Sequence, residues 1–453
     1  MSSLTSSKHA VVIGGSMAGL LAAKVLSGYY EQVTIVERDA IAVEEHEGVE
    51  STKAIERKGV PQSPQPHILL TKGYRILKDF FPDIDQPLLA AGAVPIDWGQ
   101  DFSYFSFGGW SASHKNESEI KSFSCTRPLL ENVVRQQVEA IENVTRISPY
   151  RVDGLAGDAN TVTGIRCTHR YNKSETRTLL ADLVVDASGR SSNAAQWLSD
   201  INSSLPTTDT VDARLGYATR RYKIPVGWEA NWKVLLVGHE PPENYRLGYL
   251  AQVENNAFIA TLGGYEQQYP PLDDEGFLAF ARQLPASEFY DAIAHATPIS
   301  PIKAYRSTAN KLRRYDELAH MPSGFVALGD AVCALCPAYG QGLTTSGLSA
   351  IALQNWLDAA TENSLTFQKD LLKSIKPSWD IATKSDSGFM NAKGRLAKSR
   401  IEKLMGRYMQ RLITKTHTDS ELNLTLTKIS HMIESPIKLF SPNVLIKTFS
   451  KAP

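Results

Sequence analysis

The 453-residue sequence predicts an α/β protein: a Rossmann-like parallel sheet is interleaved with an antiparallel sheet and followed by a helical C-terminal region. Three observations predict this class. A strand, a glycine turn, a helix and a second strand follow one another between residues 11 and 36. Aromatic and β-branched runs fill residues 205–305, and from about Thr366 onward no strong strand pattern remains.

The opening segment has the order of a βαβ unit. Residues 11–13 and 33–36 are mostly β-branched and apolar, as buried parallel strands are. Residues 14–19 form the turn, and one face of the helix that follows is apolar through Leu20, Leu21, Ala23 and Val25. The unit has the length expected of this motif, about 30 residues.

Two more buried strands are predicted far along the chain. Residues 183–185 lead into the turn DASGR, and residues 325–328 lead into Gly329 and Asp330. Between them, an antiparallel sheet is predicted by the runs RLGYATRRYKI, WKVLLVG, YRLGYLAQV and AFIATLGGY. Asn255-Asn256 lies between the last two runs and predicts a hairpin turn.

Two strongly polar segments are predicted to lie on the surface. Residues 40–66 are charged and then rich in proline, so we expect a long surface loop. Residues 391–416 hold eight Lys or Arg and a single Glu. They form either a membrane-surface or phosphate-binding face, or a solvated helix face. We favour the second, in which the helix packs on the body through Leu404, Met405, Tyr408 and Leu412.

Composition excludes several function classes. Lys plus Arg equals Asp plus Glu at 48 each, so no overall charge attracts nucleic acid. No apolar run reaches the length of about 18 residues that a transmembrane helix needs. The polar start MSSLTSSKHA runs directly into the first strand, so we expect a soluble, cytoplasmic chain without a signal peptide.

Four cysteines are too few for a disulfide framework in a chain of this length. Cys333 and Cys336 form a CxxC pair, but no second pair or histidine set completes a zinc site, so we expect no metal. A redox pair is one interpretation. Pro337 and the neighbouring Gly-Asp segment favour another, in which both thiols fill a tight turn.

The loop IGGSMAG connects the first strand to its helix. Gly14 permits the tight turn, Gly15 follows it, and Gly19 lets the helix approach the strand. Ser16 takes the place of a middle glycine and supplies a donor, while the helix N-terminus offers N–H groups to a pyrophosphate. Glu37 follows Gly14 by 23 residues, where its carboxylate can accept both ribose hydroxyls. Together they predict a dinucleotide site and leave NAD and FAD open.

A second segment, GDAVCALCPAYGQGL, follows the strand at 325–328. Asp330 could hydrogen-bond a sugar hydroxyl, and Gly340 and Gly342 open another helix towards an anionic or carbonyl group. The alternative is an ordinary strand–loop–helix in which the glycines serve only the backbone.

In this order, GGSMAG with Glu37, DASGR and GDAVCALCPAYGQGL resemble the flavoprotein monooxygenases of the para-hydroxybenzoate hydroxylase type. Arg127, in CTRPLLENVVRQQ, matches the family's arginine that reaches the cofactor from a helix start. Ser188-Gly189 departs from the Asp-Gly of the motif linked to NADPH handling. The resemblance implies that FAD is bound by Gly14, Gly15, Ser16, Gly19, Glu37, Arg38, Arg127, Asp330, Gly340 and Gly342.

A closer likeness is to the branch that includes polyene epoxidases of polyether antibiotic pathways. The branch carries Arg-His before the histidine that matches His67, whereas residues 64–66 of this chain are Pro-Gln-Pro. We therefore assign no catalytic role to His67, and no other residue is assigned one. The likeness spans nearly the whole chain, through the segments RKGVPQ, HILLTKG, GYATRRYKIP, KLRRYDELAHMPSGFVALGDA and SPNVL.

The resemblance implies a discontinuous FAD-binding domain (1–75, 120–204 and 306–365), a substrate domain (76–119 and 205–305) and a helical region (366–453). It also implies that NAD(P)H acts as a transient co-substrate and that a flavin hydroperoxide carries oxygen from O2 to the substrate. The substrate would be a sizeable apolar polyketide or terpenoid, epoxidised or hydroxylated. Six aromatic residues of the predicted antiparallel sheet either line the substrate pocket or belong to an ordinary sheet core, and we expect core for most of them. They are Tyr217, Tyr222, Trp228, Trp232, Tyr249 and Phe258.

Three rival functions remain open. A reductase of prenyl-chain double bonds shares the DASGR-like turn and an apolar pocket. A flavin-dependent halogenase would carry WxWxIP, which the segment IPVGWEANWKV does not match. A non-catalytic carrier of prenylated proteins reuses this fold without redox chemistry, and the complete set of cofactor motifs argues against it.

Overall fold

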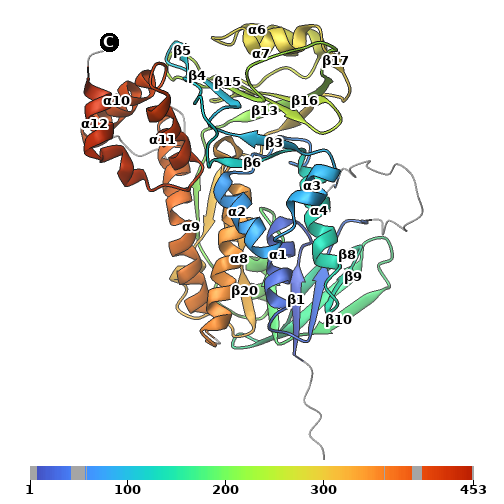
Figure 1. The fold of residues 1–453 in the computed structure, drawn as a ribbon. Coiled ribbons are helices and arrows are strands. Elements are labelled where there is room, and N and C mark those ends of the chain that lie inside the picture. Colours follow the sequence, from blue (N-terminus) through green and yellow to red (C-terminus); the bar gives the residue numbers. More distant parts are fainter. Residues whose placement is uncertain (1–7, 42–56, 58, 362, 390–399, 451–453) are drawn as a thin grey trace, which may run out of the picture.

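A five-stranded parallel sheet forms the lower part of the molecule in Figure 1. The computed structural model describes residues 8–41, 57, 59–361, 363–389 and 400–450. In spatial order the strands are β20 (Phe325–Ala327), β11 (Leu183–Asp186), β1 (His9–Ile13), β2 (Gln32–Val36) and β7 (Val144–Ile147). Every neighbouring pair is parallel, which confirms the predicted Rossmann-like sheet.

The strand order reverses between β1 and β11. From β1 the chain proceeds outward through β2 to β7, and it returns to the other side of β1 to form β11 and β20. The loops that leave β1 and β11 therefore diverge at their carboxyl ends. Such a switch point is where open α/β sheets bind ligands.

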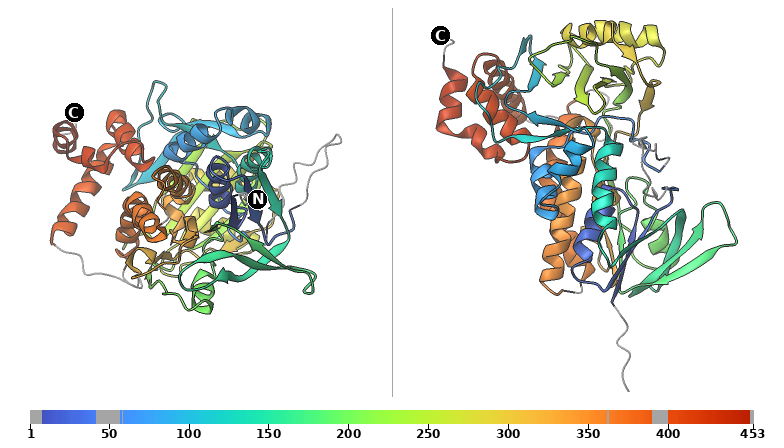
Figure 2. Two further views of the ribbon diagram at one scale, coloured as in Figure 1. Left: turned by 90° about the horizontal axis from the view of Figure 1, so that it is seen from below. Right: turned by 45° about the vertical axis from the view of Figure 1, so that its right-hand side comes forward.

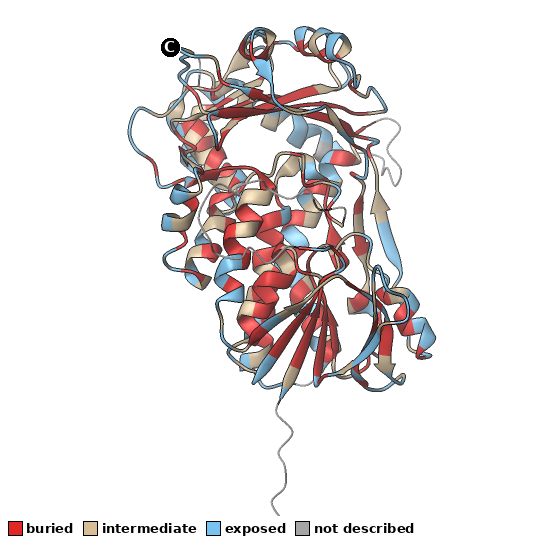
Figure 3. Ribbon diagram, turned by 90° about the vertical axis from the view of Figure 1, so that its right-hand side faces the viewer, coloured by how far each residue is buried: buried red, intermediate tan, exposed pale blue. Residues whose placement is uncertain are grey.

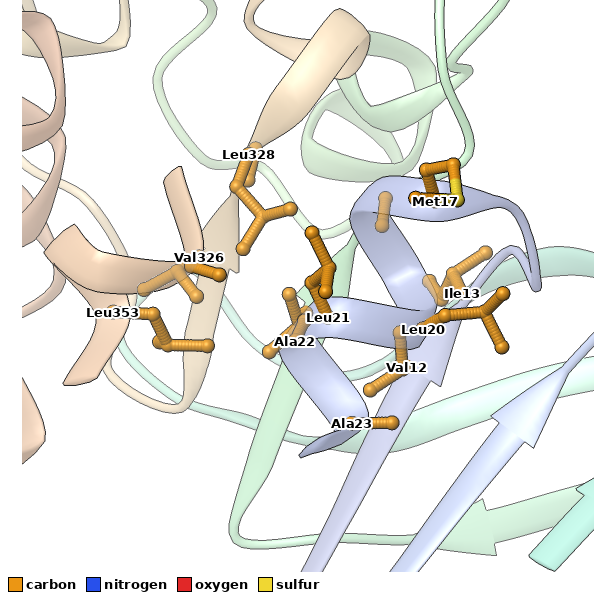
Figure 4. Close-up of a cluster of buried hydrophobic side chains, with 14 of the residues drawn as sticks. Val12, Ile13, Met17, Leu20, Leu21, Ala22, Ala23, Val326, Leu328 and Leu353 are labelled. Carbon is orange, nitrogen blue, oxygen red and sulfur yellow. The ribbon is translucent and has the colours of Figure 1, made fainter. Parts of the chain in front are cut away.

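Helices cover one face of this sheet, and a three-stranded antiparallel sheet within residues 150–180 packs on the other; their apolar side chains build the core (Figure 3). Figure 4 shows how α1 (Met17–Leu26) packs: Leu20 lies towards Val12, whereas Leu21 and Ala22 face Val326 and Leu353. The other helices of this part are α2 (Thr71–Phe80), α3 (Asp85–Ala90), α4 (Arg127–Glu139), α5 (Ala194–Asp200), α8 (Gly342–Asp358) and α9 (Ser364–Asp386).

An eight-stranded, mainly antiparallel sheet lies above the first. The four predicted runs form β13 to β16, and Asn255 and Asn256 both adopt positive φ in the hairpin between β15 and β16, as predicted. The strands in spatial order are β17 (Thr297–Pro298), β13 (Gly216–Lys223), β16 (Ala257–Gly264), β15 (Arg246–Val253), β14 (Val234–Val237), β4 (Phe102–Ser106) and β5 (Gly109–Trp110), with β18 (Lys303–Tyr305) paired to β13.

The two faces of this sheet have different neighbours. One face packs beneath α6 (Asp274–Arg282) and α7 (Glu288–Ala294). Because side chains alternate along a strand, Tyr217 and Tyr222 of β13 point to opposite faces. Four of the six aromatic residues considered above belong to the core under these helices, namely Tyr222, Trp228, Trp232 and Phe258. Core packing was the outcome expected for most of them.

Three smaller sheets were not predicted. Two of their strands are eight residues long and the others are short, but buried and exposed residues mix in them, so they lack a continuous apolar run. They are formed by β8 (Tyr150–Gly157), β9 (Val162–His169) and β10 (Thr176–Leu180), by β12 (Thr208–Val211), β19 (Asn310–Arg313) and β21 (Cys333–Ala334), and by β3 (Val94–Asp97) with β6 (Lys121–Ser124).

The C-terminal region is helical, as predicted. After α9 come α10 (Arg400–Lys415), α11 (Ser420–Ser430), the 3-10 segment η4 (Pro436–Phe440) and α12 (Pro442–Phe449). These last four elements form a unit at the side of the molecule, with α11 nearest the body (Figures 1 and 2). None of the helices within the described ranges is long and apolar enough to cross a membrane.

The predicted packing of α10 on the body is wrong for all four residues, because two are exposed and two pack within the C-terminal unit. Leu412 is fully buried and Tyr408 is half-buried, but Leu404 is 67% exposed and Met405 is 37% exposed. The C-terminal half of α10 packs on η4 and α12 rather than on the body. The preceding residues 391–399 of the basic segment lie outside the described residues.

Candidate functional site

A cavity of about 650 Å³ lies between the carboxyl edge of the parallel sheet and the face of the eight-stranded sheet turned away from α6 and α7. Tyr217 and Tyr249 line it from the eight-stranded sheet. Nine of the ten residues predicted to bind the cofactor line the same cavity: Gly14, Gly15, Ser16, Glu37, Arg38, Arg127, Asp330, Gly340 and Gly342.

The glycine loop is closely packed. Gly14 has φ +100°, and a Cβ there would lie 2.6 Å from the backbone oxygen of Ala187, in the loop after β11. A Cβ on Gly19 would lie 1.8 Å from the Gly14 oxygen. Gly19 is the one predicted residue that does not line the cavity, and it lets α1 approach β1. Both glycines are therefore required by backbone contacts.

Glu37 is held in place by the protein itself. The Gly15 N–H donates to its Oε2 at 2.8 Å, and the Asp39 N–H donates to its Oε1 at 2.8 Å. Arg57 forms an ion pair with the same Oε2. Since a carboxylate offers about four acceptor positions, these contacts leave room for about one ribose hydroxyl rather than the two we expected.

A buried ionic cluster supports the loop from α4. Glu131 pairs with Arg57, with Arg127 at 3.3 Å and with Arg135 at 3.0 Å. The Ser16 hydroxyl donates to Glu131 at 2.6 Å. Burial alone would raise the pKa of Glu131, but the charges of Arg127 and Arg57 outweigh it and leave the pKa at about 2. Glu131 is thus ionised at neutral pH.

Sequence reasoning missed Glu131 and Arg57. Glu131 follows Arg127 by four residues in RPLLE, a spacing that places both on one helix face and could have revealed it. Arg57 fell in the predicted surface loop. The described part of that segment is a loop, as predicted, and Pro61 is exposed, but the surface position is wrong for Arg57 and Gln65, whose buried side chains line the cavity. Residues 42–56 and 58 lie outside the described residues.

The segment after β20 brings the predicted second motif to the cavity. Asp330 lies in a single 3-10 turn, η2 (Gly329–Ala331), and α8 begins at Gly342, as predicted. Within the described ranges, no hydrogen bond reaches the Asp330 carboxylate, and burial raises its pKa against the opposing charge of Arg190. The Tyr217 hydroxyl, on the opposite wall, is also buried without a partner.

Two histidines in the cavity wall are neutral. Burial, together with the charge of Arg127, lowers the pKa of His67 to about 3, and burial lowers that of His239 to about 4. The Nδ1 of His67 lies 2.9 Å from the Gln65 carbonyl oxygen, which can only accept. A neutral His67 therefore donates through Nδ1 and presents Nε2 as an acceptor. His239 was not recognised from the sequence.

The structure favours the packing interpretation of the cysteines. All four are free and buried. Burial raises the pKa of Cys333 to about 12 and that of Cys336 well above its usual value, so neither is a thiolate at neutral pH. No group of side chains in the described ranges could hold a metal ion.

Asp386, at the end of α9, anchors the loop before Gly340. It accepts a hydrogen bond from the Tyr339 hydroxyl at 2.6 Å and another from the Asn310 amide at 2.6 Å. Tyr339 lines the cavity and belongs to η3 (Pro337–Tyr339). The C-terminal helical region therefore helps to shape the site.

Burial raises the pKa of Asp386 from 3.8 to about 6, so the folded state favours its neutral form. Its contribution to stability is present below pH ~4 and is lost as the pH rises through ~6. We expect the wild type to lose up to about 3 kcal/mol over this range relative to Asp386→Asn. Thermal unfolding between pH 4 and 7.5 checks this, with Asp380→Asn of the same helix as the control. Identical pH dependence in wild type and Asp386→Asn would contradict it.

One curated relative resembles most of the chain. Protein Rv3254 of Mycobacterium tuberculosis (strain ATCC 25618 / H37Rv) is 31% identical over 402 residues, which cover 85% of this chain and 81% of that protein. No family model matches the chain.

Solved structures share the fold at low identity. A flavoprotein/dehydrogenase from Cytophaga hutchinsonii is similar with a TM-score of 0.66 and 12% identity, covering 97% of this chain and 96% of that one. The p-nitrophenol 4-monooxygenase PnpA from Pseudomonas putida DLL-E4 has a TM-score of 0.63 and 15% identity, covering 95% of this chain and 99% of that one. The myxobacterial chondrochloren halogenase CndH has a TM-score of 0.60 and 14% identity, covering 97% of this chain and 99% of that one. At these identities the likeness establishes the fold.

Proposed function

The chain belongs to the same family as Protein Rv3254 of Mycobacterium tuberculosis, and from its fold and cavity we propose that it is an FAD-dependent monooxygenase. One observation carries the proposal: the cavity that begins at the glycine loop continues to the face of the eight-stranded sheet. A dinucleotide held at the loop would therefore meet a substrate held against the sheet.

The residues present fit FAD. The N-terminus of α1 offers unpaired N–H groups to the pyrophosphate, and Glu37 offers one acceptor position to a ribose. The unpartnered Asp330 carboxylate and Tyr217 hydroxyl are polar groups that a bound ligand would satisfy. In this proposal Gly340 and Gly342, at the start of α8, lie beside the flavin ring.

When bound and reduced by NAD(P)H, FAD supplies the activation of O2, from which one oxygen atom passes to the substrate and the other to water. The chain's own residues exclude water: Leu236, Leu247 and Tyr249 form an apolar wall on the sheet side. Because burial keeps His67 and His239 neutral, this end of the cavity gains no positive charge from them.

We propose a sizeable apolar metabolite of polyketide or terpenoid type as the substrate, with epoxidation or hydroxylation as the reaction. The apolar, aromatic sheet wall supports this class. Epoxidation of an alkene releases no proton and so needs no general base, which fits a wall whose two histidines are poor proton acceptors because burial lowers their pKa. NAD(P)H is proposed as a transient co-substrate.

Oxygen dependence distinguishes this proposal from a reductase of prenyl-chain double bonds. The purified chain, reconstituted with FAD, would be assayed against linear terpenes and polyenes with NADPH, once in air and once under strict anaerobiosis. We expect oxygenated product and NADPH consumption only in air. A saturated product formed without oxygen would favour the reductase. A chain that binds FAD but oxidises no NADPH under either condition would exclude both.

A further inference from the structure

Seven exposed apolar side chains gather in the C-terminal unit formed by α10, η4 and α12. We call them the C-terminal apolar surface: Ile401, Leu404, Met405, Ile437, Phe440, Ile446 and Phe449. Soluble chains rarely leave contiguous patches of large apolar residues in water, so such a surface marks an interaction site.

Tyr408 links five of the seven side chains, and Ile437 and Ile446 each lie about one turn before Phe440 and Phe449. On α10, Ile401, Leu404 and Met405 continue the stripe of Tyr408, at the helical spacing that puts residues on one face. Tyr408 stacks on Phe440 with ring centroids 5.7 Å apart, and on Phe449 at 6.0 Å. The exposed part of the α10 stripe therefore runs into the exposed residues of η4 and α12.

The unit also carries a net positive charge, unlike the chain as a whole. Residues 400–450 hold eight Lys or Arg against four Asp or Glu, whereas the whole chain holds 48 of each kind. Arg400, Lys403 and Arg407 are exposed on α10, and Lys438 lies between Ile437 and Phe440. Apolar and basic side chains thus alternate on one outward-facing unit.

From this arrangement we propose that the C-terminal apolar surface docks on the surface of a membrane rich in anionic lipids. An amphipathic helix with Leu, Ile or Phe on one face and Lys or Arg beside it is the typical element that lies in a membrane interface. Anionic headgroups complement the basic side chains, while the apolar ones enter the headgroup–acyl boundary. A symmetric contact with a second copy would instead bring two basic surfaces together.

The location of the unit agrees with this role. α11 and the residues that flank it fasten the unit to the body. Glu421 lies 3.0 Å from His114, Lys428 pairs with Glu119 at 2.8 Å, and the carbonyl oxygens of Thr416 and His431 accept from backbone N–H groups of the body. Docking through α10 and α12, on the outer side in Figure 1, would therefore leave these contacts in place.

Vesicle flotation tests the proposal with the full chain. Wild type is compared with Ile401→Ser/Leu404→Ser, with Lys403→Gln/Arg407→Gln and with Leu180→Ser, which removes an equally exposed side chain on β10. Vesicles contain phosphatidylcholine alone or mixed with phosphatidylglycerol. Thermal unfolding and bound FAD show whether each variant is folded, and light scattering gives its oligomeric state.

We expect wild type and Leu180→Ser to float with the anionic vesicles, with at least tenfold weaker binding to phosphatidylcholine alone. The apolar double variant should bind at least tenfold more weakly, and the basic variant roughly fivefold more weakly for each charge removed. Lack of binding by wild type at low salt, or equal binding by the apolar variant, would overturn the proposal. So would a wild-type dimer that the apolar variant dissociates. None of these outcomes depends on catalysis.

Discussion

Replacing Glu131 with alanine is expected to be the most destabilising single change in the site. It leaves the buried cations of Arg57, Arg127 and Arg135 without their shared carboxylate. Removing one partner of a buried ion pair typically costs about 3–5 kcal/mol, because the remaining charge is desolvated and unpaired. The Ser16 hydroxyl also loses its acceptor, so the start of α1 should become less ordered and bind FAD more weakly.

Urea unfolding and FAD titration measure the two effects of Glu131→Ala. The matched control is Glu139→Ala, on the same helix, whose partly exposed carboxylate pairs with Arg146. Arg146 is largely buried, but water can replace the partly exposed Glu139 carboxylate beside it, so we expect a smaller cost of about 1 kcal/mol. Equal destabilisation by the two variants would show that the cluster around Glu131 does not stabilise the site.

Replacing Gly14 with alanine is expected to abolish tight FAD binding while leaving most of the fold intact. At φ +100° an L-residue is strained by about 1–3 kcal/mol. The added Cβ would also lie 2.6 Å from the Ala187 backbone oxygen, which cannot move aside as a side-chain end can. The loop must shift, and we expect FAD affinity to fall about 100-fold, which corresponds to ~2.7 kcal/mol.

The control for Gly14→Ala is Gly28→Ala. Gly28 lies just beyond α1, and a Cβ there would meet its nearest neighbour at an ordinary 3.6 Å. Titration of the apo-chain with FAD, followed by flavin fluorescence, compares the two variants. If Gly14→Ala bound FAD as tightly as Gly28→Ala, the loop after β1 could not be the site of the pyrophosphate.

The features that the sequence revealed are those whose signal is local. Strands β1 and β2 are continuous apolar runs, and the four central strands of the eight-stranded sheet carry long aromatic and β-branched runs. The glycine loop combines composition with position, at the junction of a strand and a helix. The turn at Asn255-Asn256 is equally local, because asparagine tolerates positive φ.

What the sequence did not reveal depends on contacts between distant segments. In the sequence, Arg57 belongs to a charged, proline-rich loop, and only the folded structure places it in ion pairs with Glu37 and Glu131. Likewise, the stripe of Leu404 and Met405 fits a packed helix as well as an exposed one. The helical spacing of apolar residues predicts that one face of a helix is apolar, but it does not predict which other element covers that face.

Equilibrium titration of the apo-chain with FAD and with NAD+ tests the central claim most directly. We expect one FAD per chain, at least 100-fold weaker binding of NAD+, and a clear loss of FAD affinity in Asp330→Ala, whose carboxylate lines the cavity. Absence of FAD binding, equal affinity for NAD+, or unchanged affinity in both Gly14→Ala and Asp330→Ala would contradict it.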